Sequence, residues 1–336
     1  MNKKQIISLL VAAAVFVVTG VASVAINTWS DIKQVQNQKK TESALNSLFK
    51  STEESLPSED YIAVINVEGT IYSEPETTMF GESEGYDHPA TMEYVDKLMA
   101  DDHNKGILLY INTPGGEVTA SDDLYLKLKK YKETTGRKIY CYFGDQACSG
   151  GYYISMASDE IYANRNCWTG SIGVIISLTN MKGLYDKLGI QEINVTSGAN
   201  KAMGSSGEDL TEEQRSILQS LVDEAYNQFV GIVAEGRNLD VNTVKKLADG
   251  RIYSANQALQ NKLIDGTSTF EDYKAKVEAE VGEGILFYEK SDSNMSLSSL
   301  FSTIQQLRGR SDAEVISDLL ENKENGGLMY YESSLN

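Results

Sequence analysis

The chain contains only two histidines and three cysteines among its 336 residues, and each scarcity argues against a class of site. Cys141, Cys148 and Cys167 form no C-x-x-C pair and no cluster with histidine, so neither a zinc site nor a disulfide framework is expected. His88 precedes a proline in a polar loop and His103 lies in an acidic turn, so both are predicted to be solvated. In a hydrolase with so few histidines, a serine–lysine pair is the natural alternative to a serine activated by histidine.

Basic residues are also in short supply, because 30 Lys and Arg stand against 48 Asp and Glu, a formal net charge of −18. Nucleic acid is therefore not expected as a partner, since phosphate binding needs clustered Lys and Arg. The same charge disfavours broad contact with an anionic lipid surface. Hydrophobic residues make up 41% of the chain and charged residues 23%, a balance typical of a globular protein.

An apolar run of 21 residues, from Ile6 to Ile26, follows two lysines near the N-terminus. At about 1.5 Å per residue this run is long enough to cross a hydrocarbon core of about 30 Å. The flanking charges place the N-terminus in the cytoplasm, so we expect a single-pass protein of the cell membrane with an extracytoplasmic body. The alternative is a cleaved signal peptide, because Ala22–Ala25 offers small residues. Both interpretations place the body of the chain outside the cytoplasm.

The remaining chain divides by composition into three parts. Residues 27–58 are polar and predict a linker after the anchor of residues 1–26. Residues 59–285 alternate between predicted strands and helices, which indicates an α/β domain of stacked βα units. Residues 286–336 predict a loosely ordered C-terminal tail. The predicted strands are Tyr61–Val67, Gly106–Ile111, Lys138–Phe143, one near Ile161, and Ile172–Ile176; the predicted helices cover 91–100, a segment from Thr119, a short segment after Ser149, and Thr211–Glu235.

Ser149 lies at a predicted junction between a strand and a helix, directly before Gly150 and Gly151. A nucleophile at this point gains from the free N–H groups of a helix N-terminus, which favour developing negative charge. The glycines let a substrate backbone approach without a Cβ in the way. The alternative is that Ser149 only caps the helix. Ala147 departs from the G-x-S-x-G motif of α/β-hydrolases.

Two further turns of small residues lie next to predicted strands. Gly115 and Gly116 follow a proline at a strand end, and N–H groups from this turn and from the Ser149 turn could bracket a carbonyl oxygen as an oxyanion hole. The commoner meaning of such a sequence is a simple turn. Thr169–Val174 is another turn of small residues, for which close packing at a strand start is the alternative to a functional role.

Lys201 lies in the segment Ser197–Gly204, where small and apolar residues flank it. An ordinary lysine amine has a pKa near 10.4 and is protonated at neutral pH, so it does not act as a base. Burial disfavours the charged form of an amine and can make it a base. The alternative is an ordinary surface lysine.

Taken in order, these stretches resemble the signal peptide peptidase A family, which has the Clp protease and crotonase fold. The resemblance covers about residues 60–270 and also fits the N-terminal anchor. It depends on five matched segments: Asn112–Gly116, Ser149–Ser155, Thr169–Ile175, Ser197–Lys201 and Asp249–Tyr253.

The resemblance implies a serine–lysine dyad. In it, Ser149 is the nucleophile and Lys201 the general base, and Ser171 hydrogen-bonds the lysine amine and orients it. Backbone N–H groups of Gly116 and Gly150 form the oxyanion hole. No cofactor and no metal ion is expected.

The resemblance also implies a membrane-anchored serine endopeptidase that degrades remnant signal peptides and other apolar peptides after their release. Family members form homo-oligomeric rings, here expected to be an octamer, in which neighbouring subunits complete each site. The sequence departs from the family pattern at Cys148, where alanine is frequent, and at Ser206, where proline is frequent. The first departure raises the alternative of a thiol nucleophile, and the second affects only a loop.

Two other functions are compatible with parts of this pattern. The first is acyl-CoA chemistry on a crotonase-like fold, and the second is a catalytically silent scaffold that binds peptides. The tail adds a separate hypothesis, because Gly326–Tyr331 is apolar after an acidic run. This segment could enter a catalytic groove as an autoinhibitory or self-cleaved strand, and the alternative is a disordered end.

Overall fold

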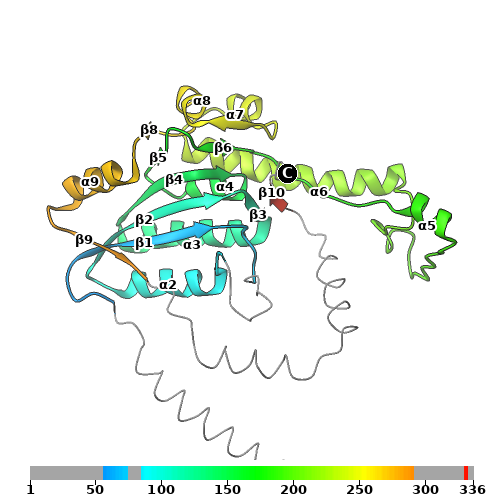
Figure 1. Cartoon of the computed structure of the whole chain (residues 1–336), viewed down its shortest axis with the longest axis horizontal. Helices are drawn as coiled ribbons and strands as arrows, with labels where there is room; N and C mark the ends of the chain where they lie inside the picture. Colours follow the sequence, from blue (N-terminus) through cyan, green and yellow to red (C-terminus); the bar gives the residue numbers. More distant parts are fainter. Residues whose placement is uncertain (1–55, 75–84, 291–328, 332–336) are drawn as a thin grey trace, which may run out of the picture. The chain divides into compact units, whose positions relative to one another are not determined.

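The computed structural model of the chain describes residues 56–74, 85–290 and 329–331 (Figure 1). Its main sheet has the strand order β7-β6-β4-β2-β1-β9, with β5 beside β4 and β8 beside β5. A second, two-stranded sheet pairs β10 with β3. The elements are β1 (Tyr61–Glu68), α2 (His88–Ala100), β2 (Asn104–Thr113), β3 (Gly115–Glu117), α3 (Val118–Thr135), β4 (Lys138–Cys148), α4 (Gly150–Ser155), β5 (Glu160–Ala163), β6 (Trp168–Gly170), α5 (Lys182–Leu188), α6 (Glu212–Gly236), α7 (Val241–Leu247), β7 (Ile252–Ser254), α8 (Ala255–Gln260), β8 (Gly266–Thr267), α9 (Phe270–Val281), β9 (Leu286–Glu289) and β10 (Met329–Tyr331).

The centre of the main sheet consists of β1, β2 and β4, which run parallel. Their sequences are almost continuously apolar, as expected for strands covered on both faces. On one face, alternate residues of these strands pack with Tyr273 and Val277 of α9; the strand residues in this cluster are Ile62, Val64, Leu108, Tyr140 and Tyr142. Helices α2 and α3 lie along the opposite side of the strands (Figure 1). The α/β class predicted from the alternating pattern is therefore confirmed.

The capping residues of the longest described helix behave as predicted. The Thr211 hydroxyl accepts a hydrogen bond from Gln214 N at 3.2 Å, and the Gln214 side chain accepts one from Thr211 N at 3.1 Å. This capping box satisfies two N–H groups that the first turn would otherwise leave unpaired. The helix α6 then continues to Gly236, one residue beyond the predicted end.

The strand predicted at Ile172–Ile176 is wrong. The chain forms β6 earlier, at Trp168–Gly170. Within residues 171–180, only Ile175 makes an isolated bridge. Gly170 and Ser171 have positive φ angles of 86° and 48°, which interrupt the extended conformation that a strand requires. From there the chain leaves the sheet and runs along α6 toward α5 (Figure 1). We call residues 174–210 the arm.

Two further features differ from the expectations. His88 is buried, not solvated, because its Nδ1 lies 2.8 Å from the Tyr86 hydroxyl and its ring packs against the Tyr86 ring. His103 is exposed as predicted and lies 3.2 Å from Asp60. Beyond residue 266, where the pattern weakens, the chain forms α9 and β9; the latter pairs in parallel with β1, past the boundary placed at residue 285.

No helix within residues 56–74, 85–290 and 329–331 is both long and apolar enough to cross a bilayer. The predicted anchor over residues 1–26 lies outside the described residues, as does the predicted linker up to residue 55. The expected membrane topology therefore stays a prediction.

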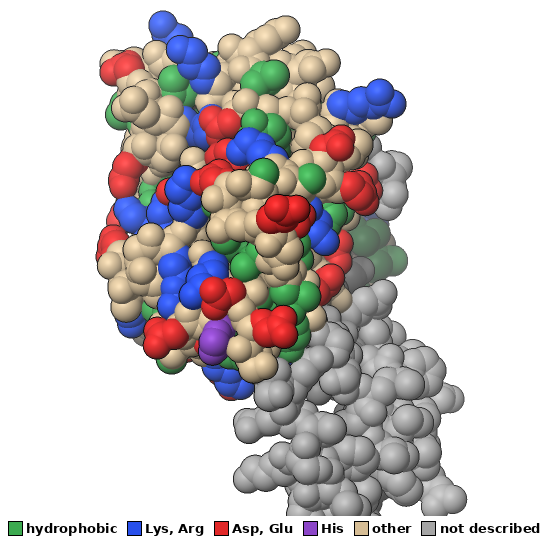
Figure 2. All heavy atoms as spheres, turned by 90° about the vertical axis from the view of Figure 1, so that its left-hand side faces the viewer, with side chains coloured by type: hydrophobic (Ala, Val, Ile, Leu, Met, Phe, Trp, Pro, Cys, Tyr) green, Lys and Arg blue, Asp and Glu red, His purple; other side chains and the backbone are tan. Residues whose placement is uncertain are grey.

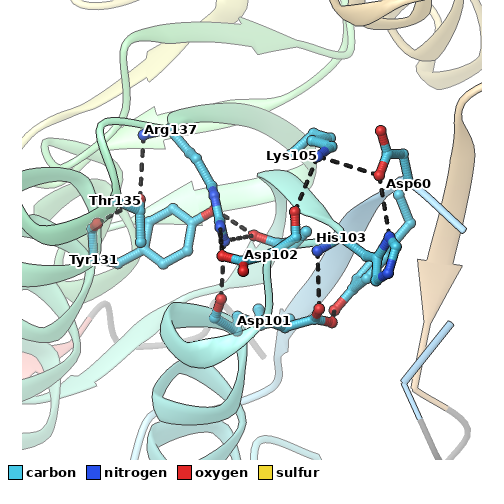
Figure 3. Close-up of polar contacts among 11 residues, drawn as sticks. Asp60, Asp101, Asp102, His103, Lys105, Tyr131, Thr135 and Arg137 are labelled. Carbon is cyan, nitrogen blue, oxygen red and sulfur yellow. Dashed lines mark hydrogen bonds and ion pairs between the residues drawn. The ribbon is translucent and has the colours of Figure 1, made fainter. Parts of the chain in front are cut away.

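A group of ion pairs and hydrogen bonds surrounds the start of β2, at the amino-terminal edge of the sheet (Figure 3). Asp60 pairs with Lys105 at 3.1 Å and with His103, while Arg137 donates to the Leu98 carbonyl at 3.1 Å. Acidic and basic side chains are also interspersed on the face of the molecule shown in Figure 2. These contacts lie at the edge opposite to the one where β2 and β4 end, so we assign them to stability.

The ion pair between Arg237 and Asp265 ties the end of α6 to the sheet. Arg237 donates to both carboxylate oxygens, at 2.9 and 2.7 Å, and Ile161 N donates to Asp265 Oδ2 at 2.8 Å. Burial opposes ionisation of Asp265, but these hydrogen bonds outweigh it and lower its pKa. The stabilisation is therefore present above the ordinary aspartate pKa of about 3.9 and is lost as the pH falls through the lower value of the folded state.

Replacing Arg237 by methionine should lower the free energy of unfolding at pH 7 by about 1–3 kcal/mol. We expect a loss in the lower half of that range, because the Asp265 side chain is 39% exposed to solvent and water screens the ion pair. The difference from the unsubstituted chain should shrink below pH 4, which urea unfolding at several pH values would measure. Lys97→Met removes an exposed pair with Glu93 on α2 and is the matched control, with an expected loss of about 0.3–0.5 kcal/mol. An equal effect of both substitutions would contradict the prediction.

Candidate active site

The ends of β2 and β4 bring the two glycine-rich turns together. The strands are parallel neighbours, and Thr113 near the end of β2 pairs with Ala147 near the end of β4. Because both strands end at the same edge, the turns that follow them lie side by side. In α/β sheets, ligands bind outside the carboxyl ends of the strands. This edge is therefore the candidate site.

Ser149 occupies a strained turn between β4 and α4. Its φ and ψ angles are 53° and −113°, a combination that is rare for a residue with a side chain. Its N–H donates to the Gly170 carbonyl at 2.8 Å, which fixes the turn against the end of β6. The residue is buried, and within the described chain its hydroxyl oxygen has no hydrogen-bond partner.

This geometry argues against the interpretation of Ser149 as a helix cap. Although Ser149 stands at the N-cap position of α4, its side chain makes no capping hydrogen bond. A buried hydroxyl left without a partner costs about 1–3 kcal/mol, so it needs an explanation, and a catalytic role is one of the few available. Neither histidine supplies a partner within the described residues, since the Ser149 hydroxyl has no hydrogen bond there; the Nδ1 of His88 bonds Tyr86 and that of His103 bonds Asp60.

Gly116 and Gly150 lie directly against each other. A Cβ atom placed on Gly150 would lie 3.4 Å from Gly116 N and only 2.4 Å from the Ser121 hydroxyl oxygen. A Cβ on Gly116 would lie 2.0 Å from the Ile71 carbonyl oxygen. Larger residues are therefore excluded at both positions, and the close approach places the Gly116 N–H beside the N-terminus of α4.

Gly115 has a different function in the same turn. Its N–H donates to the Thr113 hydroxyl at 3.0 Å, and its carbonyl accepts a hydrogen bond from Ile71 N at 2.9 Å. Glu117 N donates to the Ile71 carbonyl at 2.8 Å. Because N–H and C=O groups alternate in direction along a strand, those of Gly116 point away from Ile71, toward the other edge of β3.

Strand β10 occupies that other edge. It runs antiparallel to β3, with Tyr330 opposite Gly116, Met329 opposite Glu117 and Tyr331 opposite Gly115 (Figure 1). The C-terminal segment that the sequence singled out as apolar thus adds a strand beside the turn that adjoins Ser149. Its involvement could be anticipated from composition, whereas its partner strand could not.

Ser171 follows the end of β6 and is also held in a left-handed conformation, with φ of 48°. Its N–H donates to the Arg251 carbonyl at 2.8 Å. Arg251 in turn binds the Asp249 carboxylate, and this hydrogen bond is the main reason that the pKa of Asp249 is lowered to about 2. Ser171 lines a cavity of about 480 Å³, together with Gly173, Val174, Ile175, Gln219, Val222, Asp223, Tyr226, Ala248, Asp249 and Gly250.

Lys201 lies on the arm, on an exposed turn whose backbone closes by a hydrogen bond from Lys201 N to the Gly198 carbonyl at 3.1 Å. Figure 1 shows α5 of the arm beyond the N-terminal end of α6, away from α4. Within one described chain, the structure brings Ser149, Gly116 and Gly150 together and does not bring Lys201 into hydrogen-bond contact with Ser149.

Two buried side chains next to the site were not singled out from the sequence. Ser121 lies against Gly150 and donates to the Glu117 carbonyl at 2.8 Å. Tyr153 of α4 donates to Asp122 at 2.5 Å and accepts from Gln228 of α6 at 2.8 Å. These contacts join α3, α4 and α6. Serine, aspartate and glutamine are common on exposed helix faces, so the sequence carried no signal for this arrangement.

Comparison with known proteins gives matches along most of this region. The model of Peptidase family S49 matches residues 131–283, and the Clp protease model matches residues 67–176. A candidate signal peptide peptidase SppA of Enterococcus faecium is 39% identical over 279 residues, which cover 81% of this chain and 79% of that protein. The matches to Peptidase family S49 and to the Enterococcus faecium protein agree with the resemblance found in the sequence. The match to the Clp protease model agrees with the expected fold type.

Two longer relatives match over part of their length. Protease 4 of Haemophilus influenzae is 32% identical over 66% of this chain and 35% of its own length. The chloroplastic serine protease SPPA of Arabidopsis thaliana is 26% identical over 73% of this chain and 36% of its own length. The chain thus spans about a third of these two proteins.

Gly116→Ala should lower the free energy of unfolding by about 1–3 kcal/mol or more, because the added methyl group would overlap the Ile71 backbone. Thermal unfolding of purified variants would measure the loss. Gly231→Ala is the matched control, since Gly231 lies within α6 and a Cβ there meets no atom within 4 Å. That control should be neutral or stabilising by up to about 1 kcal/mol, as alanine is the better helix former. Equal melting temperatures for the two variants would contradict the proposed close approach.

Proposed function

Because the chain belongs to peptidase family S49 and is a serine peptidase, we propose that Ser149 is its nucleophile and that Lys201 of a neighbouring subunit is its general base. The observation that carries the proposal is the Ser149 hydroxyl, which is buried in a strained turn without a hydrogen-bond partner in the described chain. A base delivered by another copy of the chain would complete this site.

The position of Lys201 supports delivery between subunits. The arm that carries it leaves the sheet, and several of its apolar side chains are exposed, among them Leu184, Leu188, Ile190, Ile193 and Val195. Val195 is 96% exposed and Ile193 79%. Grouped apolar side chains of this kind are typical of surfaces that another protein covers. A second copy of the chain covers them in the proposed homo-oligomeric ring, for which we expect eight subunits.

The proposed reaction is acyl transfer. The neutral Lys201 amine takes the proton of the Ser149 hydroxyl while the serine oxygen bonds to the scissile carbonyl carbon. Breakage of the C–N bond then releases the amine product, which receives that proton from the lysine. A water molecule attacks the acyl-enzyme, and its proton passes to the lysine and then to the serine oxygen. The peptide is hydrolysed and both side chains return to their starting states.

The oxyanion of each tetrahedral intermediate is bound by the N–H groups of Gly116 and Gly150. Three features support this assignment: the contact between the two residues, the engagement of the Gly115 N–H by Thr113, and the direction of the Gly116 N–H away from Ile71. One such donor contributes roughly 3–4 kcal/mol in the transition state. Ser171, in the neighbouring left-handed turn, is the proposed partner that orients the lysine amine.

The substrate is proposed to bind as an extended strand on β3. Strand β10 shows that this edge accepts an antiparallel strand beside Gly116. Strand addition gives affinity through main-chain hydrogen bonds and leaves side-chain selection to pockets along the groove. We propose that the physiological substrates are apolar peptides left in the membrane after their release, including cleaved signal peptides. The predicted anchor would hold the enzyme beside them, outside the cytoplasm.

The alternatives receive less support. Acyl-CoA chemistry on a related fold is disfavoured because the matching models of Peptidase family S49 and Clp protease both describe peptidases. A silent scaffold does not explain a buried serine whose side chain neither caps its helix nor binds a neighbour in the described chain. A thiol nucleophile at Cys148 is disfavoured because its sulfur points to the Trp168 carbonyl, at 3.7 Å.

Ser149→Ala and Lys201→Ala should each lower kcat for an apolar peptide by at least about 10³-fold, because either change removes the dyad. Assembly, measured by light scattering, should be unchanged. Mixed rings of the two variants should recover about a quarter of the normal activity, since some sites combine an intact serine with an intact lysine from the neighbour. Substantial activity in Lys201→Ala alone would contradict the dyad. Failure of mixed rings to recover activity would instead contradict delivery between subunits.

Removing residues 329–336 should lower KM several-fold for a peptide substrate and leave kcat unchanged. The tail strand belongs to the same chain as β3, so it competes with the substrate at a high effective concentration. Steady-state kinetics would measure the change, with mass spectrometry confirming that the full chain still carries its tail. Equal KM values for the full chain with an intact tail and for the shortened chain would contradict competition.

Tyr330 lies opposite Gly116, so any self-cleavage should fall between Tyr330 and Tyr331. That cleavage should be absent from Ser149→Ala.

A further inference from the structure

Glu192 binds the segment of the arm that carries Lys201. One oxygen of its carboxylate accepts hydrogen bonds from the Ser205 hydroxyl and from Asn194 Nδ2, the latter at 3.1 Å. The other oxygen accepts the backbone N–H of Gly207 at 2.8 Å. A single side chain therefore joins the segment before Lys201 to the segment after it.

A series of tight turns connects this attachment to the lysine. Lys201 N donates to the Gly198 carbonyl at 3.1 Å, Met203 N to the Asn200 carbonyl at 3.3 Å, and Ser205 N to the Ala202 carbonyl at 3.0 Å. Each turn restricts the backbone between Lys201 and Ser205. The position of Ser205, which Glu192 holds, thus limits where the Lys201 backbone can lie.

Gly207 is fitted closely to the same carboxylate. A Cβ atom there would lie 2.4 Å from Glu192 Oε2 and 2.8 Å from Glu192 Cβ, so any other residue would displace the side chain. The hydrogen bond from Ser205 is the main cause that lowers the pKa of Glu192, followed by the one from Asn194. The carboxylate is therefore ionised at neutral pH, and charged acceptors form the stronger hydrogen bonds.

We propose that Glu192 is a positioning residue that holds the Lys201 turn in the conformation required for proton transfer from Ser149. The proposal depends on the proposed role of Lys201 as general base. An amine at the end of a four-carbon side chain reaches many positions, and a misplacement of about 1 Å can lower a catalytic rate by about 10²-fold. Fixing the backbone that carries the amine narrows that range.

Glu192→Ala should lower kcat by roughly 10–100-fold and leave KM within about twofold, because substrate binds on β3 and not on the arm. Glu192→Gln keeps the size of the side chain and one carbonyl acceptor, so it should recover part of the lost kcat. Asp186→Ala removes an exposed carboxylate from α5 on the same arm and should have normal kinetics.

The Lys201→Ala background separates positioning from a general structural effect. If Glu192 acts through the lysine, its replacement should lower kcat in the normal chain and cause no further loss when Lys201 is already alanine. A structural effect would lower the residual activity by the same factor in both backgrounds. Light scattering of each variant checks that the oligomer persists.

Gly207→Ala provides an independent test that leaves Glu192 in place. The added methyl group should displace the carboxylate, lower kcat in the same direction, and combine non-additively with Glu192→Ala. Normal kcat in both Glu192→Ala and Gly207→Ala, with Lys201→Ala inactive, would overturn the positioning role and leave the dyad intact. High activity in Lys201→Ala would instead overturn the proposed function.

Discussion

The conformation of Ser149 is the constraint on which the rest of the site depends. A residue with a side chain is held at a positive φ angle between β4 and α4, where it turns the chain from a strand into a helix. Such a conformation costs of the order of 1–3 kcal/mol, and it persists only because the surroundings enforce it. The Gly170 carbonyl holds the serine N–H, and the packing of α4 on β3 and α3 fixes the other side of the turn.

That packing explains why glycine recurs around the serine. Gly116 must admit the Ile71 backbone, Gly150 must admit Ser121, and Gly151 must admit the Thr113 side chain. The three requirements arise at one place because β2 and β4 end beside each other. The N–H groups that would bind an oxyanion are therefore by-products of how closely these elements approach, and they are in place before any substrate arrives.

Local features of the site could be read from the sequence, because they depend on residues that are neighbours in the chain. The junction at Ser149, the glycine turns and the capping box at Thr211 are of this kind. The predicted strand at Ile172–Ile176 failed because apolar composition does not reveal the positive φ angles before it. The burial of His88 depends on its packing with Tyr86, and β9 is recognisable only from its pairing with β1.

Lys201 shows a different limit of prediction from the sequence. Its chemistry could be proposed from the residues around it, but its distance from the serine depends on where the arm extends and on which chain lies next to it. The same limit applies to β10. Its apolar composition could be read from the sequence, but its pairing with β3 could not. Sequence motifs therefore indicate candidate reacting groups, but not the contacts that would bring those groups together.

If Lys201 is delivered between subunits as proposed, the separation of the arm from the serine turn would make catalysis depend on concentration. A chain that has not yet met its neighbours would hold a nucleophile without a base, and hydrolysis would begin only as rings form. Newly made subunits would then be harmless to surrounding polypeptides until they assemble. Dilution would reverse the process, so that specific activity would report the fraction of subunits in closed assemblies.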